Sequence, residues 1–479
     1  MALQLCAFYK SAHTWRLVFS KTYAMTASQH TTPPPHAELD RLSDIAQHVL
    51  ARAKTLGATQ AEVDVNVSTG LNVNVRMSEV ETLEHTRDRG LSLTVYVGGR
   101  KGSASTADLA ESSITATLEQ AIAIARFTEV DDCSGLGEAE LMAKTLHELD
   151  AWHPWFENGT PLSADRAIEI ALSCEAAGLA LDKRICNSDG ASVNSSSSYG
   201  IYANSHGFIG RDFSTGHSIS AALLAGDEDA MERDYYYDSK LCADDLMAAE
   251  AIGLEAARRT LARLEPQRLS TRNAPVLFAP ELARGLIGHL LSAVGGGAQY
   301  RKSSFMLNAA GSKILPDWFD MAEYPHLARA AGSANFDDEG VATTQSSLVT
   351  AGVLNRYLLG SYSARKLGLR STGNAGGVHN LVVKANAGDF AEMLQKLHTG
   401  LWVTELMGQG VNNVTGDYSR GAAGFWVENG VVSYPVSEIT IAGNLKTMYP
   451  QIVAVGNDFD LRGNVRIGSI LVEQMMIAG

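Results

Sequence analysis

Strict alternation of apolar and polar residues near the amino terminus is the feature that most constrains this fold. Val63, Val65 and Val67 alternate with acidic or polar residues, and the same period of two returns after Gly70 and after Gly90. Successive side chains of a strand point to opposite faces of a sheet. The pattern therefore predicts an antiparallel meander with one buried face.

Helical patterns flank this meander. Residues 37–56 keep apolar side chains at helical spacing until Gly57, and Asp108 is a candidate cap for a second helix. Helix, strands and helix together predict an N-terminal α/β-meander domain over residues 37–130. Residues 1–36 carry basic residues and a proline-rich end, which favours a disordered leader or a start assigned too far upstream.

The remainder reads as two further segments, which makes the whole chain α+β. A central α+β domain is expected over 151–265, with helices at 163–180 and 243–264 and exposed hairpin loops around Ser195–Ser198. A mostly β domain is expected over 270–479, with one helix at 281–293. Its strands are expected at 341–355, 402–406, 424–434 and 439–442, with a hairpin turn at 428–430.

Composition excludes several classes of function. The 479 residues include 39 Lys and Arg against 53 Asp and Glu, a net charge of −14, which argues against nucleic acid as a main ligand. No apolar run is long enough to span a bilayer, so no membrane segment is expected. The five cysteines are widely spaced and form no C-x-x-C, which fits reduced thiols in a cytoplasmic protein.

Common catalytic motifs are missing from the sequence. It contains no H-E-x-x-H, no P-loop and no G-x-S-x-G. The helix at 281–293 carries His289 among apolar residues, a position that is usually part of a core. Arg301 lies beside Lys302 and hydroxyl side chains, which suits contact with an anion or a carboxylate.

Residues 400–443 are rich in glycine, which permits close approach of another backbone. An extended peptide could add there as a strand, with Tyr418, Ser419 and Arg420 at the polar tip of a mobile loop. The other interpretation is a set of structural turns. These three residues and Arg301 are the candidate contacts for a substrate peptide.

Several long motifs show a resemblance to a known family. The chain is similar over residues 37–479 to the PmbA, or TldE, branch of the TldD/PmbA metallopeptidases. The motifs are GRKGSAST (Gly99–Thr106), MERDYYYDS (Met231–Ser239), YRKSSF (Tyr300–Phe305), SYSARKLGLRSTGNAGG (Ser361–Gly377), GDYSRGAAGFWVENG (Gly416–Gly430) and VSEITIAGNL (Val436–Leu445).

The resemblance implies a subunit of a cytoplasmic zinc metallopeptidase. In this family a PmbA-type chain pairs with a TldD-type chain. The TldD-type chain carries a His-Glu-x-x-x-His helix and a later cysteine as zinc ligands. The pair encloses a chamber and cleaves unfolded or leader peptides, including those of modified-peptide toxins and labile antitoxins. The heterodimeric partner expected here is thus a TldD-type catalytic subunit.

The sequence departs from that zinc pattern. The zinc helix aligns with residues 284–289, where Arg284 replaces the first histidine, Gly285 replaces the glutamate and only His289 remains. The ligand cysteine aligns near Ile467. A catalytic zinc needs three protein ligands and an open position. We therefore expect no catalytic residue and no cofactor on this chain, with zinc on the partner.

Two other functions compete with that of a partner subunit. One is a peptide-binding module that acts without cleavage, which the glycine-rich segment favours. The other is an independent hydrolase that uses serine or cysteine, which no spacing in the sequence favours. A partner subunit would gain peptidase activity only with the TldD-type chain, and a binding module would hold peptides equally well without it.

Overall fold

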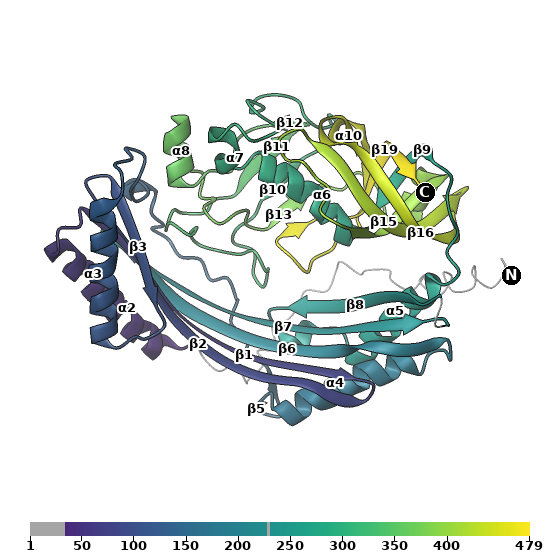
Figure 1. The fold of residues 1–479 in the computed structure, drawn as a ribbon, viewed down its shortest axis with the longest axis horizontal. Coiled ribbons are helices and arrows are strands. Elements are labelled where there is room, and N and C mark those ends of the chain that lie inside the picture. The colour runs from purple at the N-terminus through teal and green to yellow at the C-terminus, as the bar shows by residue number, and fades with distance from the viewer. Residues whose placement is uncertain (1–33, 228–229) are drawn as a thin grey trace. The chain divides into compact units, whose positions relative to one another are not determined.

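A computed structural model of the chain describes residues 34–227 and 230–479. The leader predicted for residues 1–36 lies outside the described residues up to position 33. Across the described ranges, no helix is both long and apolar enough to cross a membrane. The element labels below are those of Figure 1.

The predicted meander is confirmed as part of a six-stranded antiparallel sheet with the order β3-β2-β1-β6-β7-β8. The alternating Val63, Val65 and Val67 are buried on one face of it. The strands are β1 (Gln60–Arg76), β2 (Glu79–Val97), β3 (Arg100–Thr106), β6 (Ile185–Asn204), β7 (Ile209–Ala225) and β8 (Glu232–Lys240).

Two pairs of helices bury that face, one at each end of the long strands (Figure 1). Helices α2 (His36–Thr55) and α3 (Glu111–Phe127) pack against one end, and α4 (Ala164–Leu179) and α5 (Ala249–Ala262) against the other. Strands from the predicted 37–130 and 151–265 domains therefore share one sheet. The domain boundaries themselves stay a prediction.

The expected loops around Ser195–Ser198 are wrong. These serines lie in the middle of β6, between β1 and β7. Their hydroxyls pair across the strands, since Ser197 Oγ lies 2.7 Å from Thr69 Oγ1 and Ser195 Oγ lies 3.0 Å from His217 Nδ1. Cross-strand hydrogen bonds let a polar run continue a strand that its composition alone would end.

A second six-stranded sheet, in the order β16-β15-β14-β9-β19-β17, holds the C-terminal core. Because β16 also pairs with β19, five of its strands form a closed ring. The predicted hairpin turn is confirmed, with positive φ at both Asn429 and Gly430. The strands are β9 (Arg272–Phe278), β14 (Gly400–Met407), β15 (Asp417–Glu428), β16 (Val431–Asn444), β17 (Ile452–Val455) and β19 (Ile470–Ala478).

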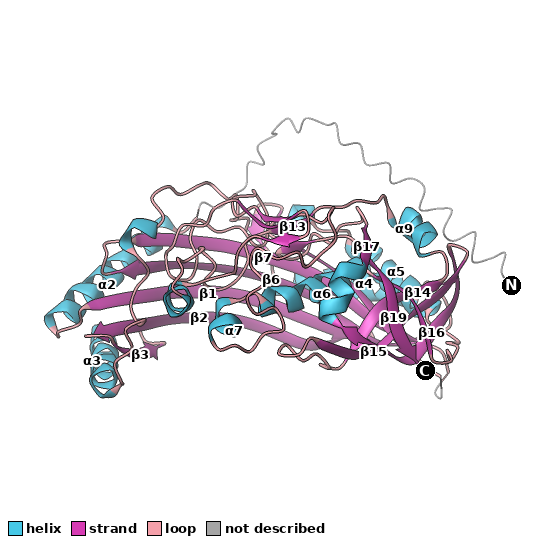
Figure 2. Ribbon diagram, turned by 90° about the horizontal axis from the view of Figure 1, so that it is seen from above, coloured by secondary structure: helices cyan, strands magenta, loops and turns pink. Residues whose placement is uncertain are grey.

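Smaller elements complete the C-terminal part (Figure 2). The strand expected at 341–355 is instead two short strands, because a turn at Ala351 and Gly352 has positive φ. The helices are α6 (Pro280–Ala293), α7 (Gly296–Tyr300), α8 (Ser361–Leu367), α9 (Phe390–Leu397) and α10 (Leu445–Met448). The strands are β10 (Met321–Glu323), β11 (Ser346–Thr350), β12 (Val353–Leu354), β13 (Leu381–Val383) and β18 (Val465–Arg466), with a hairpin of β4 (Phe156–Glu157) and β5 (Thr160–Pro161). The α+β fold class is confirmed.

Arg365 of α8 gives the SYSARKLGLRSTGNAGG motif a structural role. Its guanidinium donates to three backbone carbonyls of the segment between α3 and α4, those of Cys133 (2.9 Å), Gly135 (2.6 Å) and Leu136 (2.8 Å). Tyr362 and Lys366 of the same helix bond to Asp131. Helix α8 therefore fixes the start of this segment.

We expect Arg365→Ala to lower the free energy of unfolding by about 2–4 kcal/mol, because three carbonyls lose a charged donor. Arg365→Lys, which keeps the charge but not the planar fork, should recover less than half of that loss. Chemical denaturation of both variants measures the effect. Equal stability of Arg365→Ala and the unchanged protein would contradict this role.

Candidate functional site

Helix α6 carries the residues aligned with a zinc helix. Pro280 occupies its first turn, where the missing N–H costs nothing. Ala283, Leu286, Ile287 and Leu290 form its buried stripe, so the predicted helix is confirmed. The stripe fixes the rotation of the helix and leaves Arg284, Gly285 and His289 outside the core.

Charged side chains surround the first half of α6. Asp460 is buried and lies 3.6 Å from Arg284, and it also accepts a 2.8 Å hydrogen bond from Arg462. Glu281 pairs with Arg462 at 3.3 Å and with Arg259 at 2.9 Å. We call these five residues the arginine–carboxylate network; three guanidinium groups share two carboxylates.

Both carboxylates stay ionised in this network. Burial alone would raise the pKa of Asp460, but the hydrogen bond from Arg462 and the charges of Arg462 and Arg284 hold that pKa below its usual range. Burial also opposes ionisation of Glu281, and the charges of Arg259 and Arg462 still lower its pKa. Each of these two carboxylates therefore already has a cationic partner.

The residues at the aligned zinc positions do not fit zinc. Arg284 brings a positive charge and Gly285 has no side chain, so only His289 offers a donor atom. Ile467 is completely buried and apolar where the cysteine aligns. Within the described ranges, no group of three or more His, Cys, Asp or Glu side chains is placed to hold a metal ion.

The structure brings His289 together with two of the candidate residues from the sequence. The rings of His289 and Tyr418 meet edge to face, with centroids 6.1 Å apart. Burial, and to a smaller extent the charge of Arg420, lowers the pKa of His289, and burial raises the pKa of Tyr418 to about 12. Both groups are therefore neutral near pH 7, and Arg420 supplies the positive charge.

Arg420 has an unsatisfied donor. Its Nε is buried without a hydrogen-bond partner, and the structure as described gives the guanidinium no ion pair. A buried donor without a partner carries a desolvation cost that an incoming acceptor would relieve. The group formed by His289, Tyr418 and Arg420 therefore contains one buried donor that no acceptor among the described residues satisfies.

Ser419 and Arg301 do not join this group. Tyr418 and Ser419 lie in strand β15, so the expected loop tip is wrong: Tyr418 is 2% exposed, and Ser419 points to the opposite face. Arg301 is exposed and donates to the Tyr300 hydroxyl at 2.9 Å. The reason for the error is strand pairing, because β15 bonds to β16 from Asp417 onward.

The arginine–carboxylate network is the feature that the sequence analysis missed. Its members come from α5, α6 and the loop before β18, and no spacing links them. One signal was the MERDYYYDS motif, whose tyrosines contact the network. Arg462 stacks on Tyr237 at 4.3 Å and donates to its carbonyl, and Arg259 lies 4.6 Å from the Tyr236 ring.

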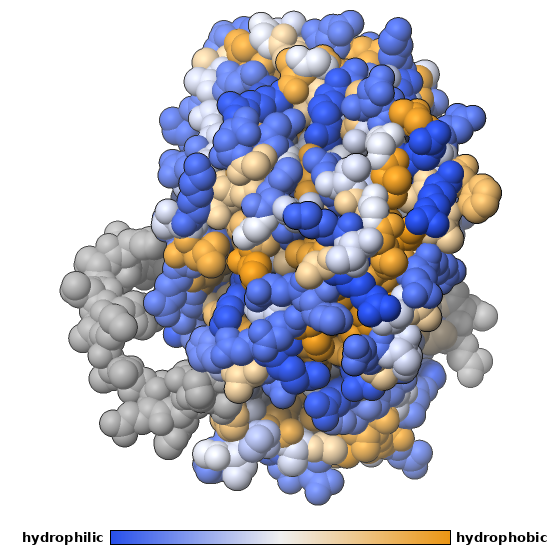
Figure 3. Space-filling model, turned by 90° about the vertical axis from the view of Figure 1, so that its left-hand side faces the viewer, coloured by the Kyte–Doolittle hydropathy of each residue, from blue (hydrophilic) through white to orange (hydrophobic). Residues whose placement is uncertain are grey.

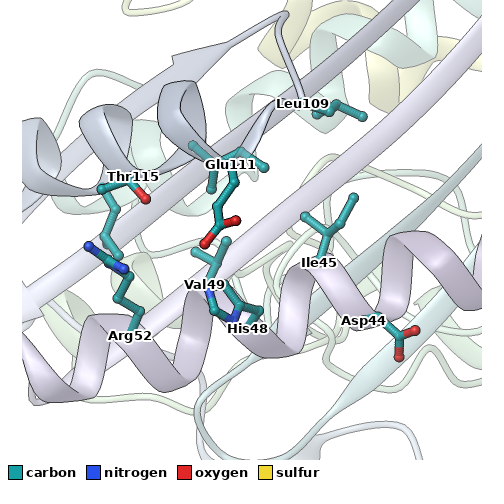
Figure 4. A pocket seen from close by; sticks show the side chains of 10 residues that line it. Asp44, Ile45, His48, Val49, Arg52, Leu109, Glu111 and Thr115 are labelled. Atoms are coloured by element: carbon teal, nitrogen blue, oxygen red, sulfur yellow. The ribbon is translucent and has the colours of Figure 1, made fainter.

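A separate groove of about 310 Å³ lies between α2 and α3 (Figure 4). Half of its ten lining residues are aliphatic and half are polar or charged, and no candidate residue from the sequence lies there. The end of the molecule that carries these helices mixes hydrophilic and apolar side chains (Figure 3). The lining residues are Asp44, Ile45, His48, Val49, Arg52, Leu109, Glu111, Ile114, Thr115 and Leu118.

Three family models match the chain. They are described as PmbA/TldA metallopeptidase domain 1 (residues 61–125), central domain (157–264) and C-terminal domain (271–479). Together they cover most of the sequence, including nearly all of the two six-stranded sheets and the whole of α6.

Comparisons with individual proteins lead to the same family as these models. "Metalloprotease PmbA" of Escherichia coli O157:H7 is 50% identical over 90% of this chain and 94% of its own. A crystal structure from Bacteroides thetaiotaomicron, titled a putative modulator of DNA gyrase, is 31% identical, with a TM-score of 0.87, over 92% of this chain and 99% of its own. TldE from Thermococcus kodakarensis, 18% identical with a TM-score of 0.78 over 91% and 100%, shares the fold.

Proposed function

Because the chain belongs to the PmbA branch of the PmbA/TldD metallopeptidase family, we propose that it is the partner subunit of a two-chain zinc metallopeptidase. The zinc and the catalytic residues belong to a TldD-type chain. This chain completes the enclosure and helps to hold the peptide. A cytoplasmic location is part of the same proposal.

The single observation that carries the proposal is the chemistry at the aligned zinc helix. Arg284 takes the place of a ligand and pairs with Asp460, and Gly285 cannot act as a general base. A dication placed there would lie beside the Arg284 guanidinium, and the nearby Asp460 carboxylate is already bonded to Arg462. The peptidase chemistry of the family therefore needs a second chain.

The substrates proposed are extended or unfolded peptides, including leader peptides of modified-peptide toxins and labile antitoxins. His289, Tyr418 and Arg420 are the proposed contacts, since the unsatisfied Arg420 donor suits a peptide carbonyl or a terminal carboxylate. Arg301 and Ser419 stay weaker candidates, because no contact of the described structure joins them to this group.

Reconstitution tests the proposal. The chain, a TldD-type chain and their mixture are each incubated with an unfolded, fluorescently labelled peptide. We expect cleavage only in the mixture, and a chelator should abolish it. Cleavage by this chain alone would contradict the proposal. Binding of the peptide with no cleavage in any mixture would instead support a peptide-binding module.

A further inference from the structure

The groove between α2 and α3, which we call the α2–α3 groove, is formed by one face of each helix. Its lining follows helical spacing, with residues 44, 45, 48, 49 and 52 on α2 and residues 111, 114, 115 and 118 on α3. Figure 4 shows the two helices side by side and running in the same direction. Asp44 lies toward one end of the groove and Arg52 toward the other.

The floor of the α2–α3 groove is aliphatic. Val49, Ile114 and Leu118 belong to the core between these helices and the sheet, and they are at most 7% exposed. Ile45 and Leu109 are partly buried and pack against the same core. A ligand with aliphatic side chains would gain free energy here, because it would remove apolar surface from water.

The polar side chains of the groove have no partners. Within residues 34–227 and 230–479, none of them makes a side-chain hydrogen bond, an ion pair or a ring contact. They carry both signs of charge, and Figure 4 shows Arg52 rising from α2 while Glu111 reaches down from α3. These polar side chains are Asp44, His48, Arg52, Glu111 and Thr115.

Arg52 is the best-defined of these groups. Its Nε is buried without an acceptor, so the guanidinium is held against the protein instead of moving freely in solvent. A buried donor without an acceptor carries a desolvation cost. The planar fork of a guanidinium matches a carboxylate, which accepts two parallel hydrogen bonds from it. Arg52 therefore suits a carboxylate that the described part of the chain does not supply.

The two acids of the groove point to a second charge on the ligand. Asp44 and Glu111 would repel a simple anion. Glu111 is not needed to complete the start of α3, because Asp108 already accepts from the Ala110 N–H at 3.0 Å and from Ser113 Oγ at 2.6 Å. Asp44 and Glu111 therefore suit an ammonium group, at a distance from the carboxylate bound by Arg52.

We propose that the α2–α3 groove binds a short aliphatic peptide with free termini. Arg52 would bind its carboxylate, Asp44 and Glu111 its ammonium group, and the floor its side chains. Two or three extended residues span about 7–10 Å, and Asp44 and Arg52 lie about 12 Å apart along the axis of α2. The volume of about 310 Å³ is in the usual range for a small ligand.

Other classes of ligand match the groove less well. A fatty acid offers a carboxylate and an aliphatic chain but has no ammonium group for Asp44 and Glu111. A nucleotide brings several negative charges to a groove that has one guanidinium and two carboxylates. The zwitterionic peptide is the class that uses the floor and both signs of charge.

Calorimetric titration of the isolated full chain tests the proposal. The probes are trileucine, trileucine with an amidated carboxyl terminus, and trileucine with an acetylated amino terminus. We expect trileucine to bind with a Kd on the order of 10–100 µM. Each blocked form should bind about tenfold more weakly, because one charged contact is lost.

Variants of the charged residues assign each contact. Arg52→Gln should weaken trileucine about tenfold but leave the affinity of the amidated form unchanged, because that form has no carboxylate to lose. Retained binding of the amidated form also shows that the variant keeps its groove. Glu111→Gln should weaken trileucine and leave the acetylated form unchanged.

Arg41 provides the matched control. It also lies on α2, but it pairs with Glu38 at 3.1 Å and does not line the groove. Arg41→Gln should therefore leave the affinity of every probe unchanged.

Four results would overturn the proposal. They are no saturable binding of trileucine at millimolar concentration, blocked forms that bind as tightly as trileucine, equal effects of Arg52→Gln and Arg41→Gln, or tighter binding of decanoate, which would assign the groove to fatty acids. A peptidase releases short peptides, but the inference rests on the groove alone. Its test needs neither a TldD-type chain nor cleavage, so its outcome is independent of the reconstitution experiment.

Discussion

Replacing Arg462 by alanine is expected to lower the free energy of unfolding by about 3–5 kcal/mol, because it leaves the buried Asp460 and the half-buried Glu281 without their shared cation. Arg462 bonds to Asp460 at 2.8 Å and to Glu281 at 3.3 Å, and it stacks on Tyr237. Its side chain is 11% exposed, so solvent cannot replace these contacts. Urea denaturation at pH 7 measures the loss.

A matched control exists at the surface. Arg268 pairs with Glu438 at 3.5 Å, but the two side chains are 89% and 77% exposed. Arg268→Ala should therefore change stability by less than about 0.5 kcal/mol. If Arg462→Ala and Arg268→Ala gave equal losses, the arginine–carboxylate network would contribute nothing beyond surface charge.

The second large effect is expected at Gly424, where two strands approach closely. A Cβ at this position would lie 2.0 Å from the Trp402 carbonyl oxygen and 2.9 Å from Val403 Cα. Neither is a flexible side chain, so β14 and β15 would have to separate at the bulge where they meet. We expect Gly424→Ala to lower the free energy of unfolding by about 3 kcal/mol or more.

Gly285 supplies the control for that substitution. It lies in helix α6, and nothing stands within 4 Å of a Cβ built there. Gly285→Ala should stabilise the chain by up to about 1 kcal/mol, through helix propensity alone. Equal thermal stability of the two variants would show that the close approach of β14 and β15 does not require glycine.

Local patterns predicted the elements whose signals lie within a few residues. The alternating valines of β1, the helix at 37–56 and the Asn429–Gly430 turn each follow from short-range geometry. The serines of β6 could not be assigned this way, because their hydrogen-bond partners are distant in the sequence. Ser195 and its partner on β7 are 22 residues apart, and Ser197 and its partner on β1 are 128 residues apart. Tertiary pairing decided that segment.

The candidate site divides in the same way. The position of His289 on a helix could be predicted from helical spacing. The alignment of motifs also predicted that the other zinc-ligand positions hold residues that cannot bind zinc. The contact between His289 and Tyr418 could not, since it depends on how β15 packs beside α6. The arginine–carboxylate network needed the fold as well, because Glu281 and Arg462 are distant in sequence.

The central claim is that this chain lacks the donor atoms to hold a catalytic zinc. The most direct test is the zinc content of the isolated full chain, measured by elemental analysis after incubation with zinc and gel filtration. We predict far less than one zinc per chain, unchanged by His289→Ala. One zinc per chain that is lost in His289→Ala would contradict the account.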